Sequence, residues 1–186
     1  MRRKIVVLMG PSGCGKSTLE AYCKELGFPV NISHTTRKPR TGKTKEVHGV
    51  HYYFVLEQEF FQIDLAESNK YGSNYYGISK AEVERNFAIS DTIIAVAELH
   101  GVKQLKEAYP NELEIVFVTL PLDEMEKRMR ARGDSEEDIQ FRLQRAIDEK
   151  EHEHGWIADH TIENWDLEES KAQLRKILGI TDEQLV

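Results

Sequence analysis

The sequence predicts an α/β fold in which helices cover both faces of a parallel sheet. Three short apolar runs, at residues 5–9, 92–97 and 114–120, are rich in β-branched side chains and are typical of buried strands. Helix-forming stretches separate these runs, as expected when crossover helices join parallel strands. At 186 residues the chain is near the size of one domain, so we expect a single main core.

The remaining elements follow in order along the chain. Helix-forming residues 17–26 come after a glycine-rich turn and stop at Gly27, a residue favoured just past a helix end. A fourth short strand is predicted at residues 160–162. Further helices are predicted at residues 80–86, 102–108 and 122–132. Residues 33–78 break this rhythm with basic and aromatic clusters, which indicates an inserted subdomain with short strands, and the densely charged residues 125–154 indicate a mobile helical excursion.

The composition excludes several functional classes. A net charge of −7 argues against a nucleic-acid-binding surface, and no stretch approaches the roughly 18 apolar residues that span a bilayer. The apolar start is too short for a signal peptide, so we expect a cytoplasmic chain without membrane or nucleic-acid partners. Cys14 and Cys23 lack the spacing of a disulfide framework or a zinc site, and His152 and His154 point to different helix faces.

A phosphate-binding motif follows the first strand. Residues 10–17, GPSGCGKS, match G-x-x-x-x-G-K-[ST] between a predicted strand and a predicted helix, which predicts a P-loop NTPase fold. Backbone N–H groups would hold the phosphates of ATP or GTP, Lys16 would reach the outer phosphates, and Ser17 would bind Mg²⁺. Cys14 is interpreted as a small neutral filler rather than as a redox-sensitive thiol. The predicted ATP-binding residues here are Gly10, Pro11, Ser12, Gly13, Cys14, Gly15, Lys16, Ser17 and Thr18.

A second anion site is predicted at residues 33–40, SHTTRKPR. Arg37 and Arg40 can form a bidentate fork on a phosphate, and the hydroxyls of Ser33, Thr35 and Thr36 add neutral donors. The chain lacks the DxxG and NKxD patterns of GTPase switches. A second anion site facing the loop therefore favours a kinase.

Read together, the motifs of this chain resemble those of the guanylate kinases. The matching segments, which run in the family's order over almost the whole chain, are GPSGCGKST (10–18), SHTTRKPR-TG (33–42), HG-x-x-YYF (48–54), NYYG (74–77), R-x-x-x-RG (128–133) and IEN (162–164). The resemblance implies one domain with a P-loop core at residues 1–32, 80–123 and 155–186. It also implies a subdomain at residues 33–79 that binds a nucleoside monophosphate, and a helical lid at residues 124–154.

The activity implied by the resemblance is transfer of the γ-phosphoryl group of ATP to GMP, with Mg²⁺. By position, the resemblance assigns Arg37, Arg40, Tyr52 and Tyr76 to the acceptor phosphate, Ser33, Glu67 and Glu98 to the guanine, and Asn164 to ATP. Guanine presents adjacent N1–H and N2–H₂ donors beside the O6 acceptor, so a carboxylate can accept from both donors. Glu67 is therefore the expected base selector.

The expected catalysis needs no general base, because the acceptor phosphate is mostly dianionic at neutral pH. The barrier is electrostatic, which calls for Mg²⁺ and a clamp of cationic side chains. Arg128 and Arg132 are four residues apart and share one helix face, while Arg130 points elsewhere. The predicted catalytic residues are Lys16, Arg37, Arg128, Arg132 and Arg142, the last on a returning helix.

Three departures from the family pattern affect the base-facing residues and a loop. Ile78 stands where the family usually has a Ser or Thr that donates to guanine O6, so that hydroxyl is displaced to Ser79 or lost. Val96-Ala97-Glu98 stands in place of an Asp-x-Asp pattern, and the loop at residues 41–48 is longer and adds Lys43 and Lys45.

We therefore expect a kinase with a guanine preference, acting on GMP or dGMP as a monomer or homodimer. The alternatives are a kinase of the same fold acting on another purine monophosphate or a sugar phosphate, and a non-catalytic binding module, which the intact phosphate loop disfavours.

Overall fold

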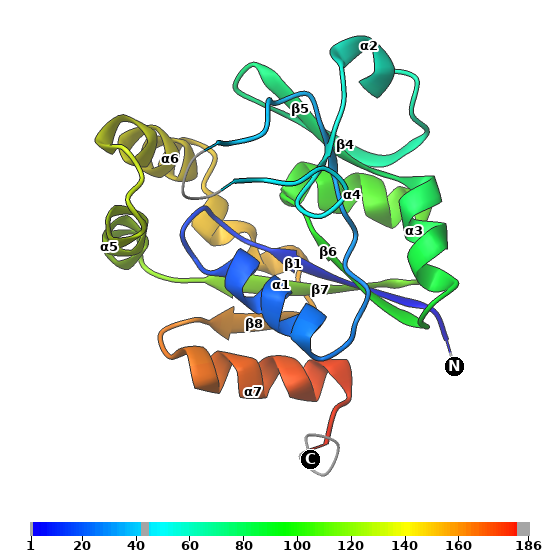
Figure 1. Ribbon diagram of the computed structural model, residues 1–186. Coiled ribbons are helices and arrows are strands. Elements are labelled where there is room, and N and C mark those ends of the chain that lie inside the picture. Colours follow the sequence, from blue (N-terminus) through cyan, green and yellow to red (C-terminus); the bar gives the residue numbers. More distant parts are fainter. Residues whose placement is uncertain (1, 42–44, 182–186) are drawn as a thin grey trace.

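The computed structural model describes residues 2–41 and 45–181, and its centre is a parallel sheet of order β6-β1-β7-β8 (Figure 1). The strands are β1 (Lys4–Met9), β6 (Thr92–Val96), β7 (Leu113–Thr119) and β8 (His160–Glu163). Each lies within one residue, at either end, of a strand expected from the sequence. The predicted α/β fold class with a parallel core is confirmed.

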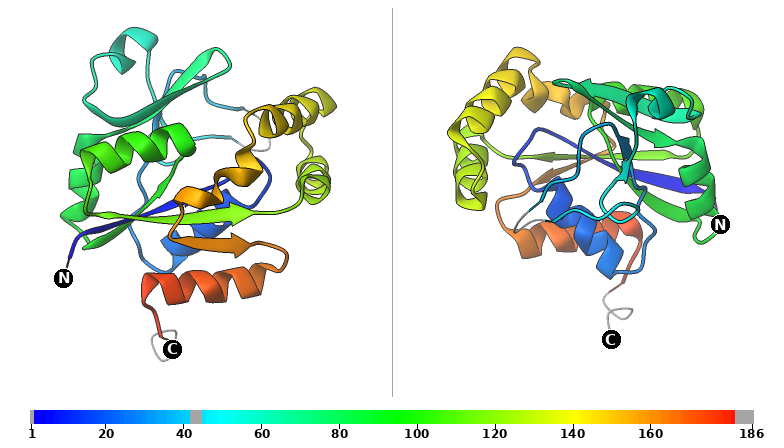
Figure 2. Two further views of the ribbon diagram at one scale, coloured as in Figure 1. Left: turned by 180° about the vertical axis from the view of Figure 1, so that it is seen from behind. Right: turned by 45° about the horizontal axis from the view of Figure 1, so that its top comes forward.

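Helices cover both faces of this sheet, as the views in Figure 2 show. On one face lie α1 (Lys16–Glu25) and α7 (Leu167–Leu178), and on the other lie α3 (Lys80–Phe87) and α4 (Leu99–Ala108). Alternate residues of β1 are buried on the two sides: Val6 and Leu8 pack with α1, whereas Ile5 and Val7 pack with α4. A strand buried on both faces needs apolar residues at every position, which explains the continuous run at its start.

A second sheet, of order β3-β2-β5-β4, forms above the first. Its strands are β2 (His34–Thr35), β3 (Tyr53–Phe54), β4 (Leu65–Tyr71) and β5 (Asn74–Ser79), with α2 (Glu57–Phe60) between β3 and β4. It packs on α4, and β5 runs directly into α3. These short strands agree with an inserted subdomain, while the boundary at residues 33–79 stays a prediction.

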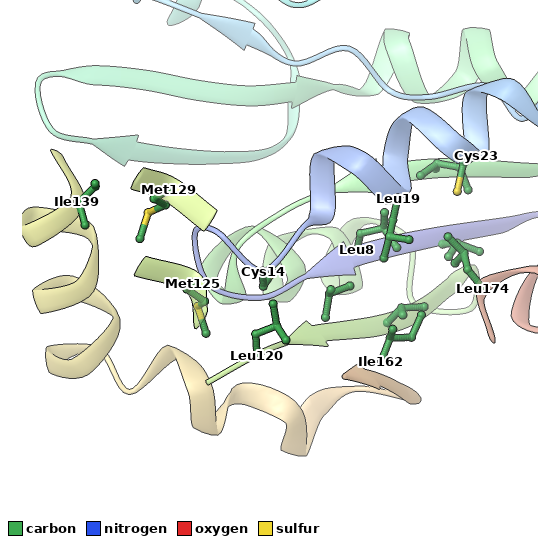
Figure 3. Close-up of a cluster of buried hydrophobic side chains, with 14 residues drawn as sticks. Leu8, Cys14, Leu19, Cys23, Leu120, Met125, Met129, Ile139, Ile162 and Leu174 are labelled. Carbon is green, nitrogen blue, oxygen red and sulfur yellow. The ribbon is translucent and has the colours of Figure 1, made fainter. Parts of the chain in front are cut away.

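The charged segment after β7 forms α5 (Leu122–Arg132), α6 (Glu136–Asp148) and the 3₁₀ helix η1 (Glu151–Ile157). The apolar side of this segment was not predicted, because charged residues surround its few apolar residues in the sequence. Met125, Met129 and Ile139 are fully buried and reach the core cluster that contains Cys14, as the close-up in Figure 3 shows. The first helix of the predicted lid is thus packed directly behind the phosphate loop.

Two expectations from composition can be compared with the described residues. No helix in residues 2–41 and 45–181 is long and apolar enough to cross a membrane. Within the same residues, no group of three or more His, Cys, Asp or Glu side chains could hold a metal ion. Cys14 and Cys23 are buried free thiols, which agrees with Cys14 as a packing residue.

Candidate active site

The phosphate loop connects β1 to α1 through glycines in the left-handed region. Gly13 has φ 86° and Gly15 has φ 100°. A Cβ on Gly15 would also lie 2.1 Å from Nδ2 of Asn164, so only glycine fits there. The geometry of the loop therefore depends on its glycines, as the motif predicted.

The N-terminus of α1 is open towards the cleft. Gly15 precedes the helix, and no side chain caps its first N–H groups. Ser17 and Thr18 in that first turn are exposed. Nζ of Lys16 lies over the loop, where it donates to the carbonyl oxygens of Gly10 (2.6 Å) and Pro11 (2.7 Å). Free N–H groups and an ammonium at one helix end form a site for phosphate oxygens.

Asn164 and Arg128 brace the loop. Nδ2 of Asn164 donates to the carbonyl of Cys14 (2.8 Å), and Asn164 is 2% exposed. Arg128 in turn donates to the carbonyl of Asn164 (2.8 Å). The contact of Asn164 seen in the structure is thus with the loop itself, and its assignment to ATP stays a prediction.

The acceptor arginines lie across the cleft, and one of them is already paired. Arg37 donates through both terminal nitrogens to Glu46, at 2.9 and 2.8 Å, and the backbone N–H of Arg40 donates to the same carboxylate (2.7 Å). The hydrogen bonds from Arg37 hold the pKa of Glu46 below its usual range. Part of the loop between these residues, with Lys43, lies outside the described residues.

Tyrosines surround this arginine. The rings of Tyr52 and Tyr76 meet edge to face, with centroids 5.9 Å apart, and the Arg37 guanidinium lies 5.4 Å from the Tyr52 ring centre. Burial raises the pKa of the Tyr52 hydroxyl, which keeps it a donor. Both predicted tyrosines thus stand beside the acceptor arginine.

The hydroxyls of Thr35 and Thr36, suggested by SHTTRKPR as neutral phosphate donors, make hydrogen bonds within the chain. Oγ1 of Thr35 donates to the carbonyl of Tyr75 (3.0 Å) and accepts from the N–H of Arg37 (3.1 Å). Oγ1 of Thr36 accepts from the N–H of Tyr75 (3.0 Å). Both hydroxyls are used to fasten the arginine loop to β5.

Glu67 occupies a buried position at the base end of the cleft. It lies on β4, is 6% exposed, and its Oε1 accepts from the N–H of Ile78 (3.0 Å). Burial raises its pKa to about 7; the Ile78 N–H acts in the opposite direction, and the charge of Glu98 raises the pKa further. A buried carboxylate without a cationic partner is suited to a ligand that brings its own N–H donors.

The hydroxyl expected after Gly77 is not available at Ser79. Ser79 is 5% exposed, and its Oγ accepts from the N–H of Glu82 as the N-cap of α3. Ile78 is fully buried in the core. Of the two outcomes expected for this hydroxyl, loss is the one that the structure supports. Ser33 lines the cleft on the same side.

Glu98 lies at the cleft wall but is held by other residues. Arg145 of α6 donates to both of its oxygens, at 3.2 and 2.6 Å, and Nδ2 of Asn69 donates to Oε2 (2.6 Å). Arg145 also stacks over the ring of Tyr71, 4.7 Å from its centre. The start of α4, strand β4 and helix α6, which belong to the predicted core, acceptor subdomain and lid, therefore meet at this one carboxylate.

The lid arginines divide as their spacing predicted. Arg128, Arg132 and Arg142 line the cleft, whereas Arg130 pairs on the outside with Glu126 and Glu136. Arg132 pairs with Asp134, and Arg142 reaches Oγ of Ser12 in the phosphate loop (3.4 Å). Arg142 is thus close to the loop, which its sequence position alone did not settle.

One cleft of about 1100 Å³ brings the two halves together. Its lining includes the exposed part of the phosphate loop (Ser12, Gly13, Gly15, Lys16, Ser17, Thr18), the acceptor residues (Ser33, Arg37, Arg40, Tyr52, Glu67, Tyr76, Glu98) and Asn164. Pro11 and Cys14 are buried beneath the loop rather than in this lining. A phosphate loop opposite a second cationic pocket defines a P-loop kinase that acts on a phosphorylated acceptor.

Comparison with known proteins identifies the family within this class of P-loop kinases. The family model described as guanylate kinase matches residues 2–180. The chain belongs to the guanylate kinase family.

The alignments with individual relatives cover nearly the full length of both proteins. A guanylate kinase of Fusobacterium nucleatum is 37% identical over 180 residues, which make up 94% of this chain and 95% of that protein. One from Francisella tularensis is 36% identical over 187 residues, 95% of this chain and 96% of that protein. The crystal structure of guanylate kinase from Anaplasma phagocytophilum has a TM-score of 0.74 and 26% identity, covering 100% of this chain and 88% of that one.

Sequence reasoning missed several residues of this site. Glu46, Asn69 and Arg145 belong to no motif. They are recognised only because the fold places them in contact with residues that were predicted, namely Arg37 and Glu98. Glu20 also lines the cleft and was overlooked. Its place one helical turn after Ser17 is the one signal in the sequence that could have found it.

Proposed function

We propose that this chain transfers the γ-phosphoryl group of ATP to GMP, giving ADP and GDP, with Mg²⁺ bound to the nucleotide. The observation that carries the proposal is a single cleft with a phosphate loop on one wall and Arg37, Arg40 and Glu67 on the other. The class of enzyme, a nucleoside monophosphate kinase, follows from membership in the guanylate kinase family.

The donor side binds ATP through backbone groups. The N–H groups of residues 12–18 surround the phosphates, and Lys16 turns from the Gly10 and Pro11 carbonyls towards the outer phosphates when they arrive. Asn164 and Arg128 keep the loop in place during this exchange.

The donor set beside this loop suits Mg²⁺. The exposed hydroxyl of Ser17 would provide one oxygen ligand, and a hard cation of this size prefers oxygen ligands. When bound, Mg²⁺ supplies charge neutralisation between the β- and γ-phosphates.

The acceptor side presents a phosphate whose oxygen is already nucleophilic. Arg37 and Arg40 hold this phosphate, with Tyr52 and Tyr76 beside them, and no residue needs to remove a proton. Arg128, Arg132 and Arg142 surround the group in transit and offset its charge in a cleft from which the lid excludes water.

Base selection rests on Glu67. Its carboxylate accepts from guanine N1–H and N2–H₂, and these donors stabilise the ionised form of a group whose pKa burial has raised to about 7. Adenine presents an acceptor at N1 and would leave the buried carboxylate unpaired. Ser33 is the hydroxyl at this end of the cleft that remains to donate to O6.

A coupled ADP-release assay across GMP, dGMP, IMP, AMP, CMP and UMP tests the proposal. We expect GMP and dGMP to be turned over well and AMP at least about 10³-fold less efficiently, as judged by kcat/KM. An enzyme that used AMP as well as GMP would contradict the assignment of the base site.

We also propose a cytoplasmic location and a monomer or homodimer. Two buried free thiols suit a reducing compartment, and the nucleotide substrates are small and freely diffusing. Fractionation and sedimentation of the purified chain measure the two properties directly.

A further inference from the structure

One carboxylate in the cleft has no partner. The carboxylates that line the cleft are those of Glu20, Glu46, Glu67, Glu98, Asp134 and Asp138. Arg37 binds Glu46, Arg145 binds Glu98, and Arg132 binds Asp134. Glu67 accepts from the N–H of Ile78, and Asp138 accepts from Oγ of Ser135 (3.0 Å). Glu20 alone makes no hydrogen bond or ion pair with the described residues of the chain.

Glu20 lies on α1, one turn after the phosphate loop. It is three residues from Ser17 and four from Lys16, spacings that place side chains on the same part of a helix surface. Side chains of a helix also lean towards its N-terminus, here towards the phosphate site. Glu20 lines the same cleft as Lys16 and Tyr52; the charge of Lys16 lowers the pKa of Glu20, and the charge of Glu20 raises that of Tyr52.

The strands beside the phosphate loop end without a carboxylate. In P-loop enzymes Mg²⁺ is held by the loop Ser or Thr and by an acidic residue that ends a neighbouring strand. The neighbours of β1 are β6 and β7, which end at Val96 and Thr119. Val96 packs against the core, and the next acid along the chain, Glu98, is held by Arg145 and Asn69.

A cation would stabilise an ionised carboxylate at this place. Without one, Glu20 would repel both the ATP phosphates and the acceptor phosphate in a poorly solvated cleft. Burial already raises the pKa of Glu20 to about 7, against the opposing charges of Lys24 and Lys16. A divalent cation between the carboxylate and the phosphates turns this repulsion into attraction.

From this placement we infer that Glu20 supplies the protein carboxylate for the Mg²⁺ of bound ATP, in place of a strand-end acid. The inference rests on the proposed function, since it concerns the metal of the same nucleotide site. Glu20 and Ser17 thus hold the metal from one helix, and the strand end at Val96 is left apolar.

The test is the dependence of ATP affinity on the metal, measured by calorimetry without GMP so that no turnover occurs. The Kd for ATP is compared in excess Mg²⁺ and in EDTA for the wild type, Glu20→Gln and Glu25→Gln. Glu25 is an exposed carboxylate on the same helix and outside the cleft. In Glu20→Gln the strengthening of ATP binding by Mg²⁺ should fall by about 10-fold or more, whereas Glu25→Gln should keep the wild-type ratio.

A second experiment measures the affinity for the metal directly. Electron paramagnetic resonance of Mn²⁺, titrated into protein with ATP, should give a Mn²⁺ affinity about 10-fold weaker in Glu20→Gln than in Glu25→Gln. Removing an unpaired carboxylate relieves a desolvation cost, so we expect Glu20→Gln to be at least as stable as the wild type in thermal melting.

An unchanged Mg²⁺ ratio and an unchanged Mn²⁺ affinity in Glu20→Gln would overturn the inference and identify Glu20 as a neutral acid in the cleft. The proposed function would then still stand if the wild type releases ADP with GMP. Failure of the wild type to use GMP, with Mg²⁺ coupling lost only in Glu20→Gln, would instead contradict the acceptor and leave the metal site intact.

Discussion

The two walls of the cleft bind phosphate by different means. The donor wall uses main-chain N–H groups at the open start of α1, whose shape depends on Gly13 and Gly15. The acceptor wall uses side chains that already have internal partners, such as Arg37 on Glu46 and Glu98 on Arg145. The backbone of the donor wall is therefore organised before ATP arrives and only Lys16 exchanges contacts there, while several side chains of the acceptor wall must exchange contacts when the monophosphate binds.

This difference locates where substitutions should act. On the donor wall a side chain adds charge to a rigid frame, so its loss should affect the rate more than the fold. On the acceptor wall the same groups serve binding and internal pairing, so a substitution should change affinity, pH dependence and stability together.

The largest effect is expected on the donor wall, at Lys16. Lys16→Met should lower kcat by roughly 10²–10³-fold, because no other ammonium reaches the transferred phosphate from the loop. Lys24→Met, on the same helix but exposed, should keep the wild-type rate. Equal losses in the two variants would contradict the placement, and steady-state kinetics with circular dichroism as a check on folding would show it.

Glu67 tests the acceptor wall next. Glu67→Gln replaces one acceptor oxygen by an NH₂ group that faces the guanine donors, and kcat/KM for GMP should fall by about 100-fold. The KM for ATP should change little, since the donor wall is untouched. Relaxed discrimination between GMP and AMP in this variant would support the role of Glu67, whereas unchanged discrimination would show that another group selects the base.

Glu67→Gln should also show that the buried carboxylate of Glu67 lowers the free energy of unfolding at neutral and higher pH. The pKa of Glu67 is raised in the folded protein from 4.5 to about 7, so the folded state holds a proton that the unfolded state has lost across this range. Wild-type stability from this group therefore falls by roughly 3 kcal/mol as the pH rises from about 4.5 to 7. Urea unfolding should find Glu67→Gln close to the wild type at pH 4 and more stable at pH 8.

A stability difference that stays constant between pH 4 and pH 8 would contradict this origin. Because both chains carry every other titrating group, including Glu20 and Glu98, the difference between them isolates Glu67.

The smallest effect is expected at Arg145, which is outside the lining of the cleft and contacts two residues that line it, Glu98 and Tyr71. Arg145→Met leaves Glu98 beside Glu67 without a cationic partner and with only the Asn69 amide as a donor. The added repulsion should raise the KM for GMP by about 10-fold with little change in the KM for ATP. Arg130→Met removes a lid arginine that pairs on the outside and serves as the matched control. Identical kinetics of the two variants would show that Arg145 acts only in lid stability.

Much of the core and of the donor wall was predictable, because local patterns specify them. Three of the four parallel strands follow from continuous apolar runs, and the phosphate loop follows from glycine spacing at the start of α1. The apolar side of α5, with Met125 and Met129 behind the loop, was hidden because charged residues surround it in the sequence.

For the acceptor wall, the sequence predicted which residues lie at the cleft, but it did not predict all of their hydrogen bonds. Arg37, Tyr52, Tyr76 and Glu67 all line the cleft. The hydroxyl of Thr35, in contrast, donates to the carbonyl of Tyr75 on β5, and that of Thr36 accepts from the N–H of Tyr75. Ser79 caps α3 and leaves no hydroxyl after Gly77 for the base. A hydroxyl's role depends on which backbone groups approach it, and that depends on strand register rather than on sequence spacing.

Short-range order along the chain was enough to identify a phosphate loop, the strands around it and a second cluster of cationic side chains, since backbone geometry and periodicity act over a few residues. The pairing of charges was decided by the tertiary structure alone. Arg145 meets Glu98 across 47 positions of sequence, and Glu20 is left without a partner although lysines stand four residues away on either side. Coulomb interactions depend on distance in space and on burial, and only the folded chain sets these two quantities.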